Sequence, residues 1–152
     1  MSGQTTIHAC AVAVGEACVL LRGRSGAGKS AAALAMIEIA RMRGAFARLV
    51  ADDRVRLEAR GGRLIAAPHP LIAGLVERRG QGVGEVRHIP RAVVVLVVDI
   101  PESGNNPPRM PEPDALAAVI EGIEVPRLVV AGAPIEIASA ALDRLRRLRA
   151  GR

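Results

Sequence analysis

A glycine-rich segment at residues 23–30 has the residue types and the spacing of a phosphate-binding loop. Its letters, GRSGAGKS, fit the pattern G-x-x-x-x-G-K-[ST]. Glycines let backbone N–H groups turn inward toward an anion, and a following helix adds the positive end of its dipole. Lys29 is expected to reach the β- and γ-phosphates, and Ser30 to give its hydroxyl to Mg²⁺. The segment therefore predicts a site for ATP with Mg²⁺, built from Gly23, Arg24, Ser25, Gly26, Ala27, Gly28, Lys29 and Ser30.

The basic residues support this interpretation of the loop. Lys29 is the only lysine, because the other twenty of the 21 basic residues are arginines. A lysine ammonium is a compact point charge, whereas the arginine guanidinium is a planar fork. A single lysine at this position indicates a site that needs a compact positive charge.

Aspartates follow two apolar runs of the sequence. Asp52 and Asp53 come directly after residues 46–51, and Asp99 follows residues 93–98. In a sheet of parallel type, Asp52 and Asp53 lie at the same carboxyl edge as the glycine loop. One member of the pair could lie near the metal while the other accepts a proton from an attacking hydroxyl. Asp99 competes for the metal, and spacing alone does not choose between Asp52 and Asp99.

The elements that must position these residues alternate between strand and helix. A mixed sheet with flanking helices, a P-loop-containing α/β fold, is therefore expected. The patterns predict strands at 6–14, 17–21, 46–51, 93–98 and 127–130, and helices at 30–43 and 135–148. They also predict a hairpin of 55–58 with 64–67 around Gly61-Gly62, a short helix within 68–76, a mobile loop at 77–86 and an irregular segment at 101–113.

Composition excludes several classes of protein. The length of 152 residues predicts one domain over 1–152, and a core of Ala, Val, Leu and Ile, because only 1% of residues are aromatic. The net charge of +6 could suit nucleic acid, but Phe46 is the only ring available for base stacking, so no nucleic acid is expected. No apolar run approaches a membrane span and no secretory signal is evident, so we expect a cytoplasmic protein without membrane contact. Cys10 and Cys18 fit no metal or redox spacing and are expected to be buried thiols.

Four segments in order resemble the catalytic domain of HPr kinase/phosphorylase. They are HACAVAV around His8, GRSGAGKS, LVADDRV at 49–55 and ERRGQGVGEV at 77–86. The resemblance implies a serine kinase that transfers phosphate from ATP, or in some members pyrophosphate, to the carrier protein HPr or an HPr-like phosphocarrier. It also implies the reverse phosphorolysis, assembly into a homo-oligomer, and a short form that lacks the N-terminal domain of full-length members.

The resemblance assigns roles to the aspartate pair, His8 and Asp99. Asp52 would accept the proton of the incoming serine hydroxyl and return it in the reverse direction, since both directions share one transition state. Asp53 would support Asp52 through the metal shell or by hydrogen bonds. His8 would adjust the proton affinity of the pair. Asp99 would be structural, or would contact the ligands of the metal rather than the metal.

The resemblance also assigns roles within residues 77–86. Glu77 would help to bind Mg²⁺, while Arg79 and Gly80 would belong to a loop that closes over the transferred phosphate. Gln81 and Gly84 stand where the family has apolar residues, so the loop is expected to be more flexible here.

Two other functions remain open from the sequence. A small-molecule or nucleotide kinase would need an arginine-rich lid, which Arg78, Arg79 and Arg87 could form. A nucleotide-binding regulatory module would bind ATP or ADP and signal through its shape without turnover.

Overall fold

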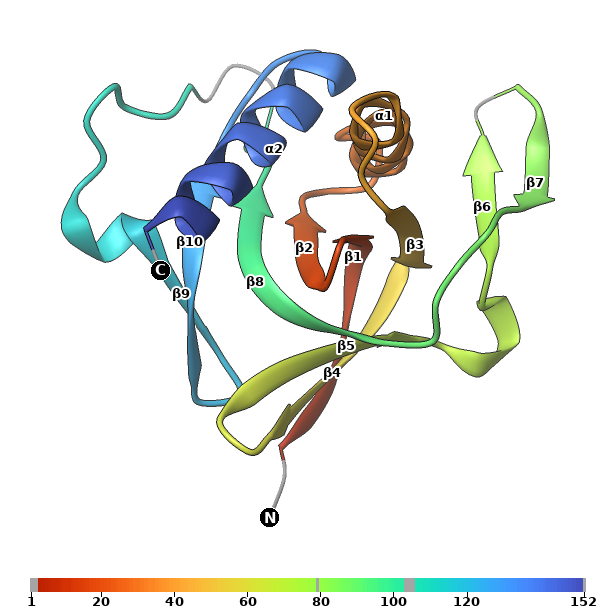
Figure 1. Ribbon diagram of the computed structural model, residues 1–152, viewed down its shortest axis with the longest axis horizontal. Coiled ribbons are helices and arrows are strands. Elements are labelled where there is room, and N and C mark those ends of the chain that lie inside the picture. The colour runs from red at the N-terminus through yellow and green to blue at the C-terminus, as the bar shows by residue number, and fades with distance from the viewer. Residues whose placement is uncertain (1–2, 79, 103–105, 152) are drawn as a thin grey trace.

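The computed structural model describes residues 3–78, 80–102 and 106–151, which form a mixed sheet with two long helices on one side (Figure 1). The strands are β1 (Gln4–Val14), β2 (Ala17–Arg22), β3 (Ala47–Ala51), β4 (Arg54–Arg60), β5 (Arg63–Pro68), β6 (Leu75–Arg78), β7 (Gly82–Glu85), β8 (Ala92–Asp99), β9 (Ala117–Ile120) and β10 (Ile123–Val129). The helices are α1 (Lys29–Met42) and α2 (Pro134–Ala150), with short 3₁₀ turns η1 (Pro70–Ile72) and η2 (Pro113–Leu116).

Strand β1 organises the sheet because its two halves have different neighbours. Residues 4–8 pair antiparallel with β4, whereas residues 9–14 pair antiparallel with β2, and β3 pairs along 11–14. Strands β2 and β3 therefore run in the same direction on the two sides of β1. Strand β8 runs parallel to both β2 and β10, and it also pairs antiparallel with β5. The prediction of a mixed sheet is confirmed.

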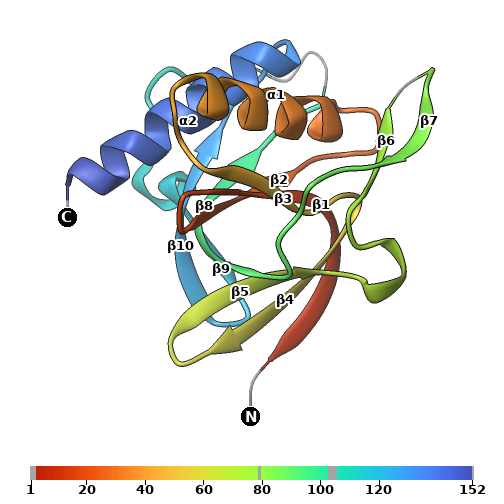
Figure 2. The same cartoon turned by 45° about the vertical axis from the view of Figure 1, so that its right-hand side comes forward.

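The core has two parts because side chains alternate across the strands. Along β1, Cys10 and Val12 face the helices, while Ala9 and Ala11 face the other side of the sheet. This alternation follows from the twofold side-chain period of a strand. Met36 of α1 is among the buried side chains of the helix-facing part. Both helices lie on this side of the sheet, as Figure 2 also shows.

Two chain reversals lie where the sequence predicted them, and both use glycine in the left-handed conformation. The β4–β5 hairpin turns at Gly61 and Gly62, whose φ angles of 59° and 77° are the left-handed values that such a turn needs. Helix α1 ends as expected before Gly44, whose φ is 79° and whose N–H bonds to the Arg41 carbonyl at 2.9 Å.

Two strand pairs differ from the prediction, and one of them, β6 with β7, is a separate two-stranded sheet. The expected mobile loop at 77–86 is largely a hairpin of β6 and β7, paired from Leu75 with Glu85 to Arg78 with Gly82. Val76 anchors it, with a 1% exposed side chain, and it stands beside α1 in Figures 1 and 2. Strand β9 was not predicted, and it pairs with β10 through a turn at Glu121 and Gly122. Within the described ranges, no helix is long and apolar enough to cross a membrane.

Candidate functional site

The glycine-rich segment connects the end of β2 to the start of α1. Gly23 passes close to the end of β8, so a Cβ atom there would meet the Ile100 carbonyl oxygen at 3.2 Å. Gly28 precedes α1 with a φ of 97°, which a side chain would strain. The first turn of α1 holds no acidic residue, so the positive end of its dipole is not offset locally.

Lys29 turns back into this segment. Its Nζ donates to the carbonyl oxygens of Gly23 and Arg24 at 2.7 and 2.8 Å, and the residue is only 8% exposed. A buried ammonium requires such partners, because an unpaired charge away from water is costly. The lysine thus closes the loop on itself and places its charge within the curve of the backbone.

Asp52 lies beside Ser30, because β2 and β3 run in the same direction and the segments that follow them meet at one edge of the sheet. The Ser30 hydroxyl donates to Asp52 Oδ1 at 2.7 Å, and the Cys10 thiol donates to the same oxygen at 2.8 Å. The backbone N–H of Glu77 points to Asp52 Oδ2 at 3.4 Å, which brings β6 to the site. Asp52 is 6% exposed, so the carboxylate is buried with polar partners on both of its oxygens.

Cys10 is the member of this group that the sequence interpretation missed. It was expected only to be buried, which it is, but its thiol also contacts the candidate catalytic carboxylate. The available signal was its spacing two residues after His8 on a strand, which places both residues on one face.

Asp53 and His8 form a second, exposed pair. The Nδ1 of His8 lies 3.8 Å from Asp53 Oδ1, and their side chains are 75% and 71% exposed. Asp53 also adopts a φ of 69°, an unusual conformation for a residue other than glycine, and such strain is concentrated at functional sites. Side-chain contacts therefore join Asp53 to His8 and Asp52 to Ser30, rather than joining all four side chains.

The remaining predicted residues belong to β6 and the turn that follows it. The Glu77 side chain is exposed, and its contact with Asp52 is made by its backbone. Arg79 lies outside the described residues. Gly80, in the turn between β6 and β7, and Gly82, the first residue of β7, have φ angles of 78° and 79°. In the described part of the chain, no three His, Cys, Asp or Glu side chains gather in a group that could hold a metal ion.

Asp99 lies at the same edge of the sheet as Asp52 but has different hydrogen-bond partners. Arg22 donates to its two oxygens at 2.7 and 2.8 Å, and Arg127 donates to Oδ2 at 2.5 Å. Burial alone would raise the pKa of Asp99, but these hydrogen bonds and charges hold it below its usual value. We call Arg22, Asp99 and Arg127 the strand clamp, because they join the ends of β2, β8 and β10.

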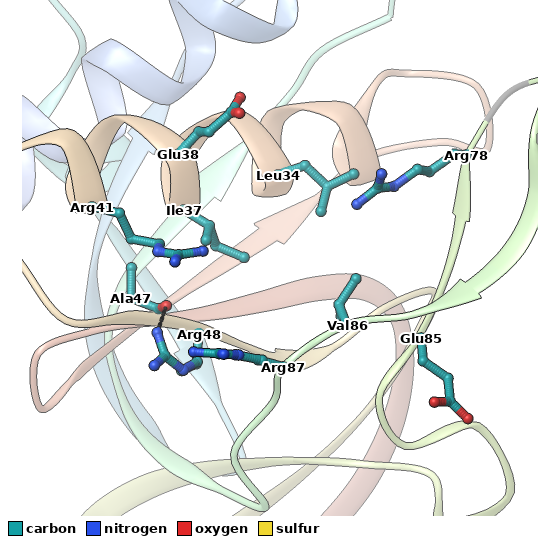
Figure 3. Close-up of a pocket in the computed structure, with 10 residues that line it drawn as sticks. All are labelled: Leu34, Ile37, Glu38, Arg41, Ala47, Arg48, Arg78, Glu85, Val86 and Arg87. Carbon is teal, nitrogen blue, oxygen red and sulfur yellow. Dashed lines mark hydrogen bonds between the residues drawn. The ribbon is translucent and has the colours of Figure 1, made fainter.

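A cavity of about 490 Å³ lies next to the site, between α1, β3 and the β6–β7 hairpin (Figure 3). It is separate from the Ser30–Asp52 contact, since neither residue lines it. Four arginines from different parts of the chain surround it, namely Arg41, Arg48, Arg78 and Arg87.

Comparison with known proteins assigns the chain to a family. Residues 1–96 match the family described as HPr Serine kinase C-terminal domain. An HPr kinase/phosphorylase of Bacillus pumilus is 33% identical over 136 residues, which cover 83% of this chain and 42% of that protein. One from Brevibacillus brevis is 36% identical over 106 residues, covering 63% and 32%. The chain thus spans less than half the length of these two relatives.

A solved structure agrees with this match over nearly the whole chain. The structure of the Hpr(Ser) kinase/phosphatase from Coxiella burnetii is similar with a TM-score of 0.74 and 26% identity, covering 97% of this chain and 99% of that one. The mixed α/β fold with its eight-stranded sheet is therefore that of an HPr kinase structure. The chain belongs to the HPr Serine kinase C-terminal domain family.

Proposed function

We propose that this chain is an ATP-dependent serine kinase that phosphorylates HPr or an HPr-like phosphocarrier and can also reverse the reaction. The hydrogen bond from Ser30 to Asp52 carries the proposal, because it places a buried carboxylate beside the hydroxyl expected to bind the metal. Family membership and the names of the relatives, which are HPr kinase/phosphorylases, support the choice of acceptor.

The residues present fit a nucleotide with Mg²⁺. The loop supplies glycine backbone at the start of α1, an ammonium at Lys29 and a hydroxyl at Ser30, which suit phosphate oxygens and a hard cation. Glu77 and Asp53 are further candidate ligands from neighbouring segments. When bound, Mg²⁺ would neutralise charge that develops on the transferred phosphate.

Asp52 would accept the proton of the serine hydroxyl in this proposal. Its Oδ1 already receives two hydrogen bonds, whereas Oδ2 has only the longer contact with the Glu77 N–H. Oδ2 is therefore the oxygen better placed to take a proton. In the reverse direction the same oxygen would return the proton. Asp53 and His8 are both exposed, so they would support Asp52 on the side from which HPr would approach.

The direct test incubates the protein with γ-labelled ATP and HPr. Label on a serine of HPr, lost in Asp52→Asn, is the expected result, and Asp53→Asn should retain part of it. Transfer that survives in Asp52→Asn and disappears in Asp53→Asn would move the proton acceptor to Asp53. Lys29→Ala should abolish the rise in melting temperature that ATP causes, since a ligand stabilises only the state it binds.

The arginine-lined cavity favours a second candidate, a small-molecule kinase. Its volume is suited to a metabolite, and Arg78 and Arg87 could hold an anionic acceptor within it. Label that appears in a small molecule from a cell extract, and not in HPr, would favour this function. ATP binding without label in any acceptor would instead favour a nucleotide-binding regulatory module.

A further inference from the structure

The Cys10 thiol is oriented by the site rather than by simple packing. Its Sγ lies 2.8 Å from Asp52 Oδ1 and 3.8 Å from Ser30 Oγ, and the residue is completely buried. The other cysteine offers a contrast within the same chain. Cys18 is equally buried on the opposite side of the sheet, and its thiol lies 3.8 Å from the Val19 carbonyl.

The geometry makes the thiol the donor of this bond. A carboxylate oxygen can only accept, and Asp52 Oδ1 lies 2.8 Å from the Cys10 Sγ. The residue is completely buried, which argues against covalent chemistry at Cys10.

We propose that Cys10 is a positioning residue, whose S–H bond to Oδ1 holds the Asp52 carboxylate so that Oδ2 faces the reacting serine hydroxyl. This inference rests on the proposed kinase function. Ser30 alone cannot fix the carboxylate, because its hydroxyl is also expected to bind the metal and its proton can then be oriented differently. The thiol comes from β1, so its donor does not depend on the nucleotide loop.

The hydrogen bond can be measured without turnover from the S–H stretching band in the Raman spectrum. The S–H band of a hydrogen-bonded thiol lies at lower frequency than that of a free thiol, and the chain contains only two cysteines. We expect two bands, the lower of which disappears in Cys10→Val and the upper in Cys18→Val. In Asp52→Asn the Cys10 band should move toward that of Cys18, because a neutral amide is a weaker acceptor.

Kinetics then separate positioning from packing. Cys10→Val fills a similar volume but donates nothing, and we expect kcat to fall about fivefold with an unchanged KM for HPr. Cys10→Ser restores a donor and should return kcat toward the wild-type value, whereas Cys18→Val should alter neither kcat nor KM.

Each outcome decides the proposal. A wild-type kcat in Cys10→Val, or two S–H bands at the same high frequency, would overturn it. A fall in kcat that Cys10→Ser does not rescue would show a packing role only and also overturn it. If even wild-type protein transfers no phosphate, the kinase function fails. The Cys10 band then decides alone whether the thiol positions Asp52: a low band that responds to Asp52→Asn supports it, and an unresponsive band refutes it.

Discussion

Replacing Asp99 by asparagine tests whether the strand clamp stabilises the fold and leaves nucleotide binding to the residues around Asp52. The asparagine oxygen, in the place of Oδ2, can still accept from Arg22 and Arg127, whereas its amide nitrogen would face the Nε donor of Arg22. One of the three bonds to Asp99 is therefore lost, and the other two are weakened because the acceptor no longer carries a charge. Each such bond contributes about 1.5–3 kcal/mol.

The exposure of the partners reduces this cost. The side chains of Arg22 and Arg127 are 32% and 27% exposed, so their guanidinium groups regain water in the variant. With a discount of about half for this solvation, the free energy of unfolding should fall by about 2 kcal/mol. For a protein of this size, the melting temperature should fall by about 4–8 °C.

The assay is urea and thermal unfolding followed by circular dichroism, because the chain has no Trp or Tyr to report by fluorescence. The folded-state pKa of Asp99 lies below its unfolded value, so its stabilisation is complete above about pH 4 and is lost as the pH falls through the folded pKa. The difference between wild type and Asp99→Asn should accordingly be full at pH 7 and shrink at low pH.

Asp143→Asn is the matched control. Asp143 also has two arginine partners, Arg146 and Arg147, but these lie on the outer face of α2 with side chains 76% and 70% exposed. Its substitution should lower the melting temperature much less than Asp99→Asn.

The affinity for ATP with Mg²⁺, measured by calorimetry at low temperature, should change less than about threefold in Asp99→Asn. An unchanged melting temperature, or a tenfold loss of affinity, would refute the assignment of Asp99 to structure.

Three further predictions concern single positions. Asp53→Gly should raise the free energy of unfolding by up to about 1 kcal/mol in urea titrations, because glycine adopts the φ of 69° without strain, while phosphate transfer falls; a destabilised variant would contradict this reason. Native protein should react with a thiol reagent at neither Cys10 nor Cys18 at pH 8, since burial raises the pKa of each to about 12, and urea should expose both, as mass spectrometry would show. Gly23→Ala should weaken ATP binding in a thermal-shift assay more than Gly62→Ala does, because its Cβ meets Ala27 and Ile100 while that of Gly62 meets nothing within 4 Å; equal effects would argue against a close approach at Gly23.

The sequence predicted those parts of the fold whose pattern is local. Apolar runs located β1 and β2, and Gly61-Gly62 located a hairpin, because apolar composition and left-handed backbone are properties of short segments. The hairpin at 75–85 was missed because its glycines weaken the strand pattern, and Val76 anchors it through contacts distant in sequence. Strand β9 was missed because its turn uses Glu121 with Gly122 rather than a typical Asn-Gly pair.

The site shows a similar division. Sequence reasoning placed Asp52 at the edge of the glycine loop and named Asp99 as its competitor for the metal, and in the structure both lie at that edge. It could not choose between them, because both follow strands of the same direction. Side-chain direction makes the distinction: the pairing of Arg22 with Asp99 across β2 and β8 occupies one carboxylate, while Asp52 faces Ser30. The contact between the Cys10 thiol and Asp52 could not be predicted for the same reason, since it depends on how β3 pairs with β1.

The folded-back Lys29 changes what binding an anion would involve. Its ammonium already has two carbonyl acceptors, so a phosphate would have to replace these bonds or share them. The net affinity would then be a difference between two sets of bonds of similar strength. Substitutions that only reorient the peptide groups at residues 23 and 24 would therefore alter affinity without touching the bound molecule, by making the lysine easier or harder to release.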